Sequence, residues 1–588
     1  MGALMISIKR FILIIFGVLL LAAGNQSCGS TPSTEEQMNP LTQITGIQPD
    51  KAFYHPGETI HLEVHFKSQT ERSAPIKLVV WITHLAELID KMEYDLSLTG
   101  DEQSVDLTFP APQNAPQGYG VDLYLETIPG EVLAATSTAF DVLQHWTQTP
   151  RYGFLSDFYP ERTDSSATME TLTRYHINGL QFYDWMYRHE QFLTDEDPYV
   201  DLMGRTLSRK TVDLLIRAAH DHGIAAMPYT AVYGGSVAFY EAHPDWALLN
   251  YSGKPVFFGD NFMVIMDPRA SSPWTAHLLE QFDLILENTA FDGIHLDQYG
   301  SPQEGYDNQG ERYDLAPVLA DFINLTKARV QAQRLDGAVV FNAVGNWPIE
   351  SVAPSDQDFT YIEVWPPYIW FKDLHDLIVQ AQSLGHGKPV VLAAYIDPAN
   401  EENVRLVDAV IFATGGGHIE LGEQNGLLAD AYFPRYKHLS SDLAVDLSHL
   451  YDFAVRYQDV IGPRTQDVTQ EYQERITLEG VATAPNLLDN KVWPIVRQND
   501  QSIALSLINL LGVKNPEWRE PIPSSPTSIA DTQIRIMGLD HQVSRVWFAT
   551  PDGSDLSPRI LEFSQQGEEL TFVIPSLAYW DLIMIEWK

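Results

Sequence analysis

The chain has 588 residues, of which 45% are hydrophobic and 11% aromatic, so it can form large packed cores and is not a disordered chain. It has 37 Lys and Arg residues and 78 Asp and Glu residues, which gives a formal net charge of −41. This charge excludes nucleic acid and anionic membrane surfaces as partners, and a neutral substrate such as a sugar or peptide suits it better.

The N-terminal residues have the pattern of an export signal. Lys9 and Arg10 precede the apolar run FILIIFGVLLL, which is too short to span a membrane comfortably. We assign residues 1–27 to a signal peptide and residues 28–43 to a linker. Cys28 is the only cysteine, and Gln-Ser-Cys resembles a relaxed bacterial lipobox. This predicts an exported lipoprotein on the outer membrane or cell surface. The alternative is cleavage upstream, giving a secreted or periplasmic protein.

Residues 44–145 have the alternation of β-strands. Ile60, Leu62, Val64 and Phe66 alternate with polar residues, and Pro-Gly pairs separate such runs. Several strands of this length predict an N-terminal immunoglobulin-like β-sandwich, which acts as a separate domain.

Short apolar strands alternate with helical patterns from residue 146 to 462. Repeated βα units predict a central (β/α)8 TIM barrel. Residues 463–588 return to strands and predict a C-terminal antiparallel β-sandwich, so the chain is multidomain. The strands expected in the barrel are Tyr152–Asp157, Gly179–Asp184, Ala225–Tyr229, Gly293–Asp297, Val339–Ala343, Thr360–Trp365, Val390–Tyr395 and His418–Leu421.

Several of these barrel strands end in an acidic residue, where barrel enzymes place their chemistry. Two carboxylates that face each other across such a site are what glycosidic bond hydrolysis requires. The alternative is that these acids are structural and pair with Arg or cap helices. The pattern alone does not choose a pair among Asp157, Asp184, Asp297, Glu363 and Glu420.

Five motifs in barrel order resemble glycoside hydrolase family 66, which contains endo-dextranases and cycloisomaltooligosaccharide glucanotransferases. They are PRYGFLSDF, QFYDWMYRH, FDGIHLDQYG, YIEVWPP and IFATGGGHIELGE. The resemblance implies that Asp297 is the nucleophile and Glu363 the general acid/base. A retaining pair of this kind is expected to lie about 5–6 Å apart.

The remaining candidates are substrate-binding residues. Asp184, Trp185 and His189 follow strand two and are predicted to bind sugar hydroxyls and stack on the ring, or else to cap the loop and pack. The family often has a second His where Glu190 stands here, which departs from the pattern. Trp365 is included from the strand-six motif.

Three further positions are predicted near the ends of strands five and eight. Asn342 is expected to hold a substrate hydroxyl or to orient Glu363. His418 and Glu420 follow three glycines, which let the backbone approach a ligand, so a sugar clamp is one interpretation. A tight turn with a salt-linked His–Glu pair is the other.

No metal and no cofactor are expected. The acidic cluster Asp195, Glu196, Asp197 and Asp201 lacks the spacing of a calcium loop and is interpreted as a solvated face. No phosphate-binding loop, serine elbow or metalloprotease motif is present.

The expected function is retaining endo-hydrolysis of dextran, with dextran or isomaltooligosaccharide as the substrate. In the family, cyclising members carry an inserted carbohydrate-binding module after strand seven. Here only residues 397–417 separate Ile396 from His418, which leaves no room for one. The alternatives are a cyclising glucanotransferase and a non-catalytic surface glycan-binding protein. The only membrane association expected is through the predicted N-terminal lipid anchor.

Overall fold

The computed structural model of the protein describes residues 42–68, 76–97, 102–128, 130–307, 309–483 and 489–587. The predicted signal peptide, Cys28 and most of the predicted linker lie outside the described residues. Within these ranges, no helix combines the length and the apolar character needed to cross a membrane.

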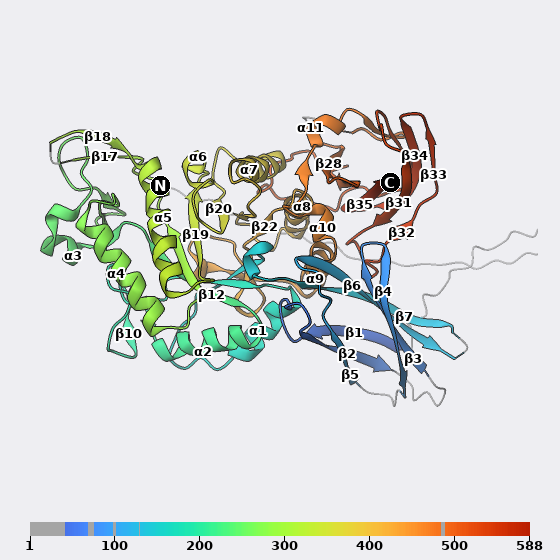
Figure 1. Ribbon diagram of the computed structural model, residues 1–588, viewed down its shortest axis with the longest axis horizontal. Coiled ribbons are helices and arrows are strands. Elements are labelled where there is room, and N and C mark those ends of the chain that lie inside the picture. The colour runs from blue at the N-terminus through green and yellow to red at the C-terminus, as the bar shows by residue number, and fades with distance from the viewer. Residues whose placement is uncertain are drawn as a thin grey trace, which may run out of the picture. The chain divides into compact units, whose positions relative to one another are not determined.

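The N-terminal part consists of two antiparallel sheets that share one hydrophobic core (Figure 1). Ile60, Leu62, Val64 and Phe66 are all buried in that core, so the alternation predicted for this strand is confirmed. One sheet has the order β1-β2-β5 (Thr42–Pro49, Thr59–Ser68, Glu102–Pro110), and the other β4-β3-β6-β7 (Glu87–Leu96, Ile76–His84, Gln117–Thr127, Val132–Val142).

The centre of the molecule is a curled eleven-stranded sheet with the order β22-β21-β20-β19-β16-β12-β9-β8-β23-β24-β25. The pairs from β22 to β23 are parallel, whereas β24 and β25 add antiparallel strands at one end. The bounds are β8 Tyr152–Leu155, β9 Gly179–Phe182, β12 Ala225–Ala231, β16 Gly293–Asp297, β19 Ala338–Val344, β20 Phe359–Glu363, β21 Val390–Ala393, β22 Gly417–His418, β23 Leu421–Gly422, β24 Gly426–Leu427 and β25 Lys437–His438.

Each consecutive pair of parallel strands from β8 to β22 is connected through a helix. Helix α2 shows why these connecting segments are helical. At its start the Ser208 side chain accepts a hydrogen bond from the Thr211 amide, and Val212, Leu215 and Ile216 form one buried face. Figure 1 shows α2, α4 and α5 beside the sheet. The connecting helices are α1 Ser165–Arg174, α2 Arg209–Asp221, α4 Pro273–Asn288, α5 Leu315–Gln333, α6 Ile349–Val352, α7 Phe371–Leu384 and α8 Glu401–Ala413.

One short segment joins the two ends of the parallel series. β22 pairs with β21 and β23 pairs with β8, and only Ile419 and Glu420 separate β22 from β23. This close pairing needs glycine, because a Cβ at Gly422 would lie 2.3 Å from the carbonyl oxygen of Phe154.

Alternation along the strands sorts their residues into two cores. Tyr152, Phe154, Val340 and Tyr361 belong to a cluster on the inner face of the curled sheet, and intervening residues such as Leu296 belong to the large cluster under the helices. The same alternation makes a residue that ends β16 or β20 face inward. The side chains of Asp297 and Glu363, which end these two strands, therefore point into the same region inside the curled sheet.

Three small antiparallel units are inserted between the strands and helices. These are β10-β11 (Tyr199–Val200, Thr206–Leu207), β13-β15-β14 (Gly234–Ser236, Met263–Ile265, Phe257–Phe258) with α3 Val237–Ala242, and β17-β18 (Glu304–Tyr306, Arg312–Asp314).

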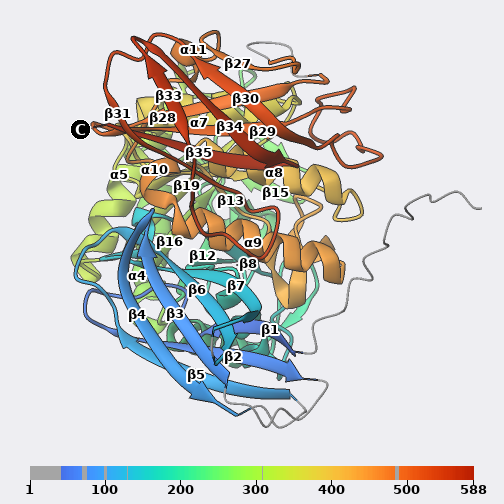
Figure 2. The same cartoon turned by 90° about the vertical axis from the view of Figure 1, so that its right-hand side faces the viewer.

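The C-terminal part again consists of two sheets with a shared core. Trp493, Trp547 and Trp580 lie on the other face of the larger sheet and join the large central cluster. Figure 2 shows α9 between the N-terminal strands and the C-terminal strands. The larger sheet is β26-β28-β29-β35-β31-β32 (Gln466–Asp467, Val492–Gln498, Ser502–Asn509, Trp580–Trp587, Val543–Ala549, Arg559–Ile560), and the smaller is β27-β30-β34-β33 (Ile476–Leu478, Ile529–Ile536, Glu569–Leu577, Phe563–Gln566); α9 is Ser441–Arg456, α10 Gln458–Ile461 and α11 Thr469–Tyr472.

Candidate active site

Two carboxylates meet at the carboxyl ends of the central strands. Asp297 ends β16 and Glu363 ends β20, and Asn342 of the strand between them, β19, bonds to both. The Asn342 Nδ2 atom donates to Asp297 Oδ1 at 2.8 Å and to Glu363 Oε2 at 3.2 Å. The two bridged oxygens are therefore no more than about 6 Å apart, which is consistent with the separation expected for a retaining pair.

Two tyrosines hold the other oxygen of each carboxylate. Tyr229 of β12 donates its hydroxyl hydrogen to Asp297 Oδ2 at 2.7 Å. Tyr395, two residues after β21, donates to Glu363 Oε1 at 2.9 Å. Both carboxylates thus have a fixed orientation, with donors from three neighbouring strand ends around them.

The surroundings make ionisation of this pair costly. Burial and the nearby Glu363 charge raise the pKa of Asp297 to about 7, against the hydrogen bonds from Tyr229 and Asn342. Burial also raises the pKa of Glu363, and its hydrogen bonds from Tyr395 and Asn342 oppose the rise. Because the two close carboxyl groups interact, they titrate together, and their burial favours a state in which one of them is protonated.

The two acids line a pocket together with Asp184, His189 and Trp365, so these five predicted site residues are brought together. The pocket walls are rich in rings, which suits the apolar faces of sugars. Its other lining residues include Tyr183, Tyr187, Tyr229, Phe258, Tyr299 and Tyr432.

Asp184 follows β9 in a left-handed backbone conformation, with φ of 51°. Residues other than glycine hold such a conformation at a cost, and they do so most often at functional sites. Burial raises the pKa of Asp184 to about 6, and the guanidinium of Arg205 opposes this rise. The Arg205 side chain also donates to the Asp184 carbonyl oxygen at 2.8 Å, which fixes the loop.

His189 is 7% exposed, and burial lowers its pKa to about 4, so its imidazole is neutral. Among the described residues, its Nδ1 atom has no hydrogen-bond partner. A pocket ligand with a hydroxyl group would supply one. The adjacent Glu190, where the sequence departs from the family pattern, accepts from the backbone amide of Ser236 at 3.0 Å and also from its hydroxyl.

Trp185 does not reach the pocket, so the stacking role predicted for it is corrected. Its side chain is 1% exposed and packs on Phe291, and its Nε1 atom donates to the Tyr229 carbonyl oxygen at 3.2 Å. The loop after β9 turns at Asp184, which directs the next side chain into the core. The alternative interpretation, core packing, holds for this residue.

His418 and Glu420 also lie away from the pocket, at the closing segment between β22 and β23. Each is 1% exposed, and His418 Nδ1 lies 2.8 Å from Asp408 Oδ1 and 3.4 Å from Glu420 Oε2. Burial opposes ionisation, yet the two carboxylates raise the pKa of His418 to about 10. His418 and Glu420 therefore form the salt-linked pair of the second interpretation, and the prediction of a sugar clamp is wrong.

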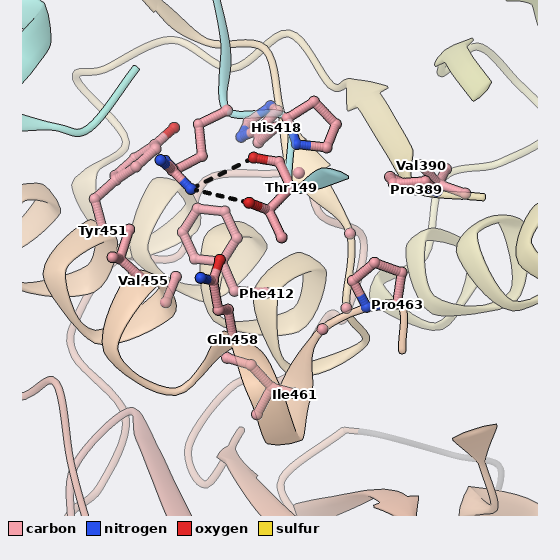
Figure 3. A pocket seen from close by; sticks show the side chains of 17 residues that line it. Thr149, Pro389, Val390, Phe412, His418, Tyr451, Val455, Gln458, Ile461 and Pro463 are labelled. Atoms are coloured by element: carbon pink, nitrogen blue, oxygen red, sulfur yellow. Dashed lines mark hydrogen bonds between the residues drawn. The ribbon is translucent and has the colours of Figure 1, made fainter. Parts of the chain in front are cut away.

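His418 instead lines a separate small cavity of about 60 Å³, together with Tyr451 and Phe412 (Figure 3). Pro150, Pro389 and Gly417 also line it, and these residues stand at the amino ends of the central strands. That end of the parallel sheet is opposite the end at which Asp297 and Glu363 lie. A Cβ at Gly415 would lie 2.5 Å from the Ile461 carbonyl oxygen, and one at Gly417 would lie 2.8 Å from that of Pro150, so these glycines permit close packing there.

One group of side chains in the described part of the chain has the composition of a metal site. Ligand atoms of Asp408, His418 and Glu420 all lie within 4.8 Å of one another. An imidazolium between two carboxylates accounts for this arrangement without an ion. The predicted absence of a metal stays a prediction.

The acidic cluster before α2 is not a solvated face throughout, which corrects the prediction for Asp201. This residue is 6% exposed, lines the pocket and accepts from Arg205 Nε at 2.7 Å. Of the other strand-end acids, Asp157 accepts from the Tyr436 hydroxyl at 3.0 Å, and Asp397 pairs with Lys437.

Tyr229 and Tyr395 are site residues that sequence reasoning missed. Each ends a strand that was predicted, at Ala225–Tyr229 and Val390–Tyr395, so the signal was their place at the catalytic edge. Their hydroxyls hold the two carboxylates from these strand ends.

The raised pKa of Asp297 predicts a stability effect. The unfolded carboxyl ionises near its ordinary pKa of 3.8, whereas burial and the nearby Glu363 raise the pKa of Asp297 in the folded pair to about 7. Between these pH values the folded state binds more protons, so the free energy of unfolding falls as pH rises. We expect Asp297→Asn to match the wild type at pH 4 and to melt about 1–3 °C higher at pH 8, measured by calorimetry.

Asp397→Asn is the matched control, because Lys437 lowers the pKa of Asp397. Its contribution to stability is present above the ordinary pKa, so this variant should be slightly less stable at pH 8. Identical melting of Asp297→Asn and the wild type at both pH values would contradict the burial cost assigned to Asp297.

Comparison with known proteins gives one family. The profile of glycosyl hydrolase family 66 matches residues 49–584. A cycloisomaltooligosaccharide glucanotransferase of Niallia circulans is 25% identical over 704 residues, covering 92% of this chain and 72% of the relative. A dextranase of Streptococcus salivarius is 21% identical over 603 residues, covering 86% and 72%. The crystal structure of a Paenibacillus sp. cycloisomaltooligosaccharide glucanotransferase complexed with cycloisomaltoheptaose superposes with a TM-score of 0.85 at 23% identity, covering 92% of this chain and 100% of that one.

Proposed function

The chain belongs to glycosyl hydrolase family 66, and on this basis we propose that it is a retaining endo-dextranase that hydrolyses internal α-1,6-glucosidic bonds and releases linear isomaltooligosaccharides. The family predicted from the sequence motifs is confirmed. The similar proteins include both glucanotransferases and a dextranase, so hydrolysis in place of cyclising transfer is part of the proposal.

The proposal includes the architecture. We take the curled sheet and its helices as a (β/α)8 barrel over residues 146–462, since residues 417–422 pair with both ends of the parallel series. The paired sheets on either side are taken as an immunoglobulin-like sandwich over residues 44–145 and an antiparallel sandwich over residues 463–588.

In the first step, Asp297 attacks the anomeric carbon while Glu363 donates its proton to the departing O6. The glycosidic bond breaks and an ester forms between the sugar and Asp297. The Tyr229 hydroxyl and the Asn342 amide hold the attacking carboxylate in one orientation.

In the second step, Glu363 removes a proton from water, and the water oxygen attacks the anomeric carbon from the side that O6 left. The ester breaks, Asp297 is released as a carboxylate, and Glu363 is again protonated. A buried pair that shares one proton suits this cycle, because one member must start ionised and the other protonated.

The observation that carries the proposal is the Asn342 amide that bridges the two carboxylates. Inverting enzymes need about 6.5–9.5 Å between their acids to admit a water molecule, whereas retaining enzymes need about 5–5.5 Å. A bridge through one amide nitrogen favours the shorter spacing.

Three pocket residues are proposed to bind the sugar. Asp184 would accept hydrogen bonds from hydroxyls, and the unpaired His189 Nδ1 atom would take another. Trp365 follows Glu363 by two residues and offers a ring for stacking.

The interval between β21 and β22 supports hydrolysis over cyclisation. Helix α8, Glu401–Ala413, occupies it, and no separate module is inserted there. A module that held the far end of a glucan would raise the effective concentration of that chain's own hydroxyl over water. Without one, water is the favoured acceptor.

The product distribution tests this point. We expect a dextran digest to contain linear isomaltooligosaccharides as the main products by anion-exchange chromatography. Cyclic products as the main species would refute hydrolysis as the main reaction and leave the pair at Asp297 and Glu363 in place. No release of reducing ends at all would favour a non-catalytic glycan-binding protein.

Export and lipidation remain part of the proposal. The basic and apolar residues before Cys28 favour an exported protein held to the membrane through that cysteine. Freely secreted or periplasmic protein is the alternative.

A further inference from the structure

A loop of the C-terminal part forms hydrogen bonds with the segment that follows Glu363. The backbone amide of Phe371 donates to the Pro516 carbonyl oxygen at 3.0 Å. The backbone amide of Trp518 donates to the Ile369 carbonyl oxygen, also at 3.0 Å. The Trp518 Nε1 atom donates to the Tyr368 carbonyl oxygen at 3.1 Å. Residues 516–518 therefore fix the path of the chain just beyond the end of β20.

Asn403 of helix α8 anchors the same loop from its other side. Its Nδ2 atom donates to the carbonyl oxygens of Trp518 and Glu520, at 2.9 and 2.8 Å. Its Oδ1 atom accepts from the amide of Ile522 at 2.9 Å. Arg519 thus lies in the middle of a loop whose backbone is held on both flanks, and its side chain has little freedom to move away.

Arg519 extends from this loop toward the proposed acid/base. Its Nη2 atom donates to the carbonyl oxygen of Val364, the residue after Glu363, at 3.1 Å. The guanidinium lies 4.5 Å from the ring centre of Trp518 and 5.5 Å from that of Trp365. It is held between an anchored ring and a ring that lines the pocket.

The charge of Arg519 is not committed elsewhere. Among the described residues, no carboxylate forms an ion pair with it, and its buried Nε atom has no hydrogen-bond partner. Burial lowers the pKa of Arg519, and the nearby Tyr395 hydroxyl and Glu363 carboxylate oppose this, in a chain where acidic residues outnumber Lys and Arg by 78 to 37. A cation left unpaired in so acidic a chain indicates a specific use.

We infer that Arg519 is a positioning residue for Glu363: it holds the strand end that carries this carboxylate and favours the ionised form that activates water. The inference rests on the proposed function. It gives the C-terminal part of the chain a role in the reaction, because the positive charge that acts on this carboxylate comes from residue 519.

The other groups that face Glu363 do not provide this charge. Asp297 repels the ionised form, and the tyrosines around it are neutral, since burial raises their pKa values well above 10. These groups are Tyr183 just after β9, Asp297 of β16, Tyr361 of β20 and Tyr395 two residues after β21. Burial raises the pKa of Glu363, and after the hydrogen bonds to its side chain the positive charge of Arg519 also opposes this rise.

Glu363 must be protonated in the first step, so the alkaline limb of kcat/KM reports its pKa in the free enzyme. Removal of the cation raises this pKa. Arg519→Gln should therefore move the alkaline limb on dextran to higher pH by roughly 0.5–1 unit and lower kcat about tenfold, with KM within about twofold.

Three further variants separate charge from packing. Arg519→Lys keeps the charge and loses the planar stack, so its alkaline limb should stay near that of the wild type. Arg519→Met keeps the packing without the charge and replaces Arg519→Gln if that variant does not fold. Arg535→Gln is the control, because it removes one charge at an exposed ion pair with Glu569 and should leave the profile unchanged.

A measurement without substrate separates this inference from the proposed function. With [5-¹³C]glutamate labelling, the signal that Glu363→Gln removes gives the pKa of Glu363 directly, and Arg519→Gln should raise it by the same amount as the limb. An unchanged Glu363 pKa would overturn the inference. A lower melting temperature with an unchanged pH profile would also overturn it, because Arg519 would then be only an anchor. A wild-type protein inactive on dextran would refute the function, and the labelled pKa would still decide the role of Arg519.

Discussion

Asp297→Asn is expected to lower kcat on dextran by about 10³-fold or more, on every α-1,6-glucan substrate. The amide is a poor nucleophile and forms no ester with the anomeric carbon. The glycosyl ester that the first step forms and the second step hydrolyses is therefore lost. Reducing-end release measures the loss. The fold should be retained, because an Asn side chain still accepts from the Tyr229 hydroxyl, which bonds to Asp297 at 2.7 Å.

Asp397→Asn is the control for that variant. Asp397 also follows a strand of the central sheet but pairs with Lys437 outside the pocket, so its amide should keep near wild-type turnover. Azide provides a second test, since it can enter the space left in Asp297→Gly and attack the sugar directly. The glycosyl azide should then have the inverted configuration. A product of retained configuration would contradict Asp297 as the nucleophile.

Glu363→Gln is expected to lower kcat on dextran by about 10²-fold or more, because O6 is a poor leaving group unless it is protonated. The loss should be much smaller in the first step with an aryl glycoside, whose phenolate departs without a proton. A burst of phenolate followed by slow turnover would show the stalled ester at Asp297. Stopped-flow absorbance measures both phases.

Azide should also accelerate Glu363→Gln, because it needs no general base and replaces the water that Glu363 activates. The product should be a glycosyl azide of retained configuration. Glu350→Gln makes the same charge change at an exposed position of α6 and should not respond. If azide gave the retained product with the Asp297 variant and the inverted product with the Glu363 variant, the two roles would be exchanged.

Local patterns in the sequence determined where the two acids that we propose as catalytic lie. The strand Gly293–Asp297 was predicted with its observed bounds, and the strand ending near Glu363 within two residues. Because side chains alternate along a strand, a strand of known bounds already specifies which of its residues face inward at its end. The five motifs then identified the family, and they chose Asp297 and Glu363 from the strand-end acids, which the pattern alone did not.

Only the tertiary structure decided which other residues join them. Trp185 and His418 lie within a few residues of strand ends, like true pocket residues, yet both are buried elsewhere. A left-handed turn at Asp184 and the closing segment between β22 and β23 set those directions, and neither has a periodic signal.

The contacts that tune the acids also come from distant parts of the chain. Asn342, Tyr395 and Arg519 bond to Glu363 or act on it through space, and each belongs to a different element. Alternation within a strand acts between residues two positions apart and is visible in the sequence. The meeting of Glu363 with a loop near residue 519 depends on how the C-terminal sheets pack on the central one, and only the folded chain determines that.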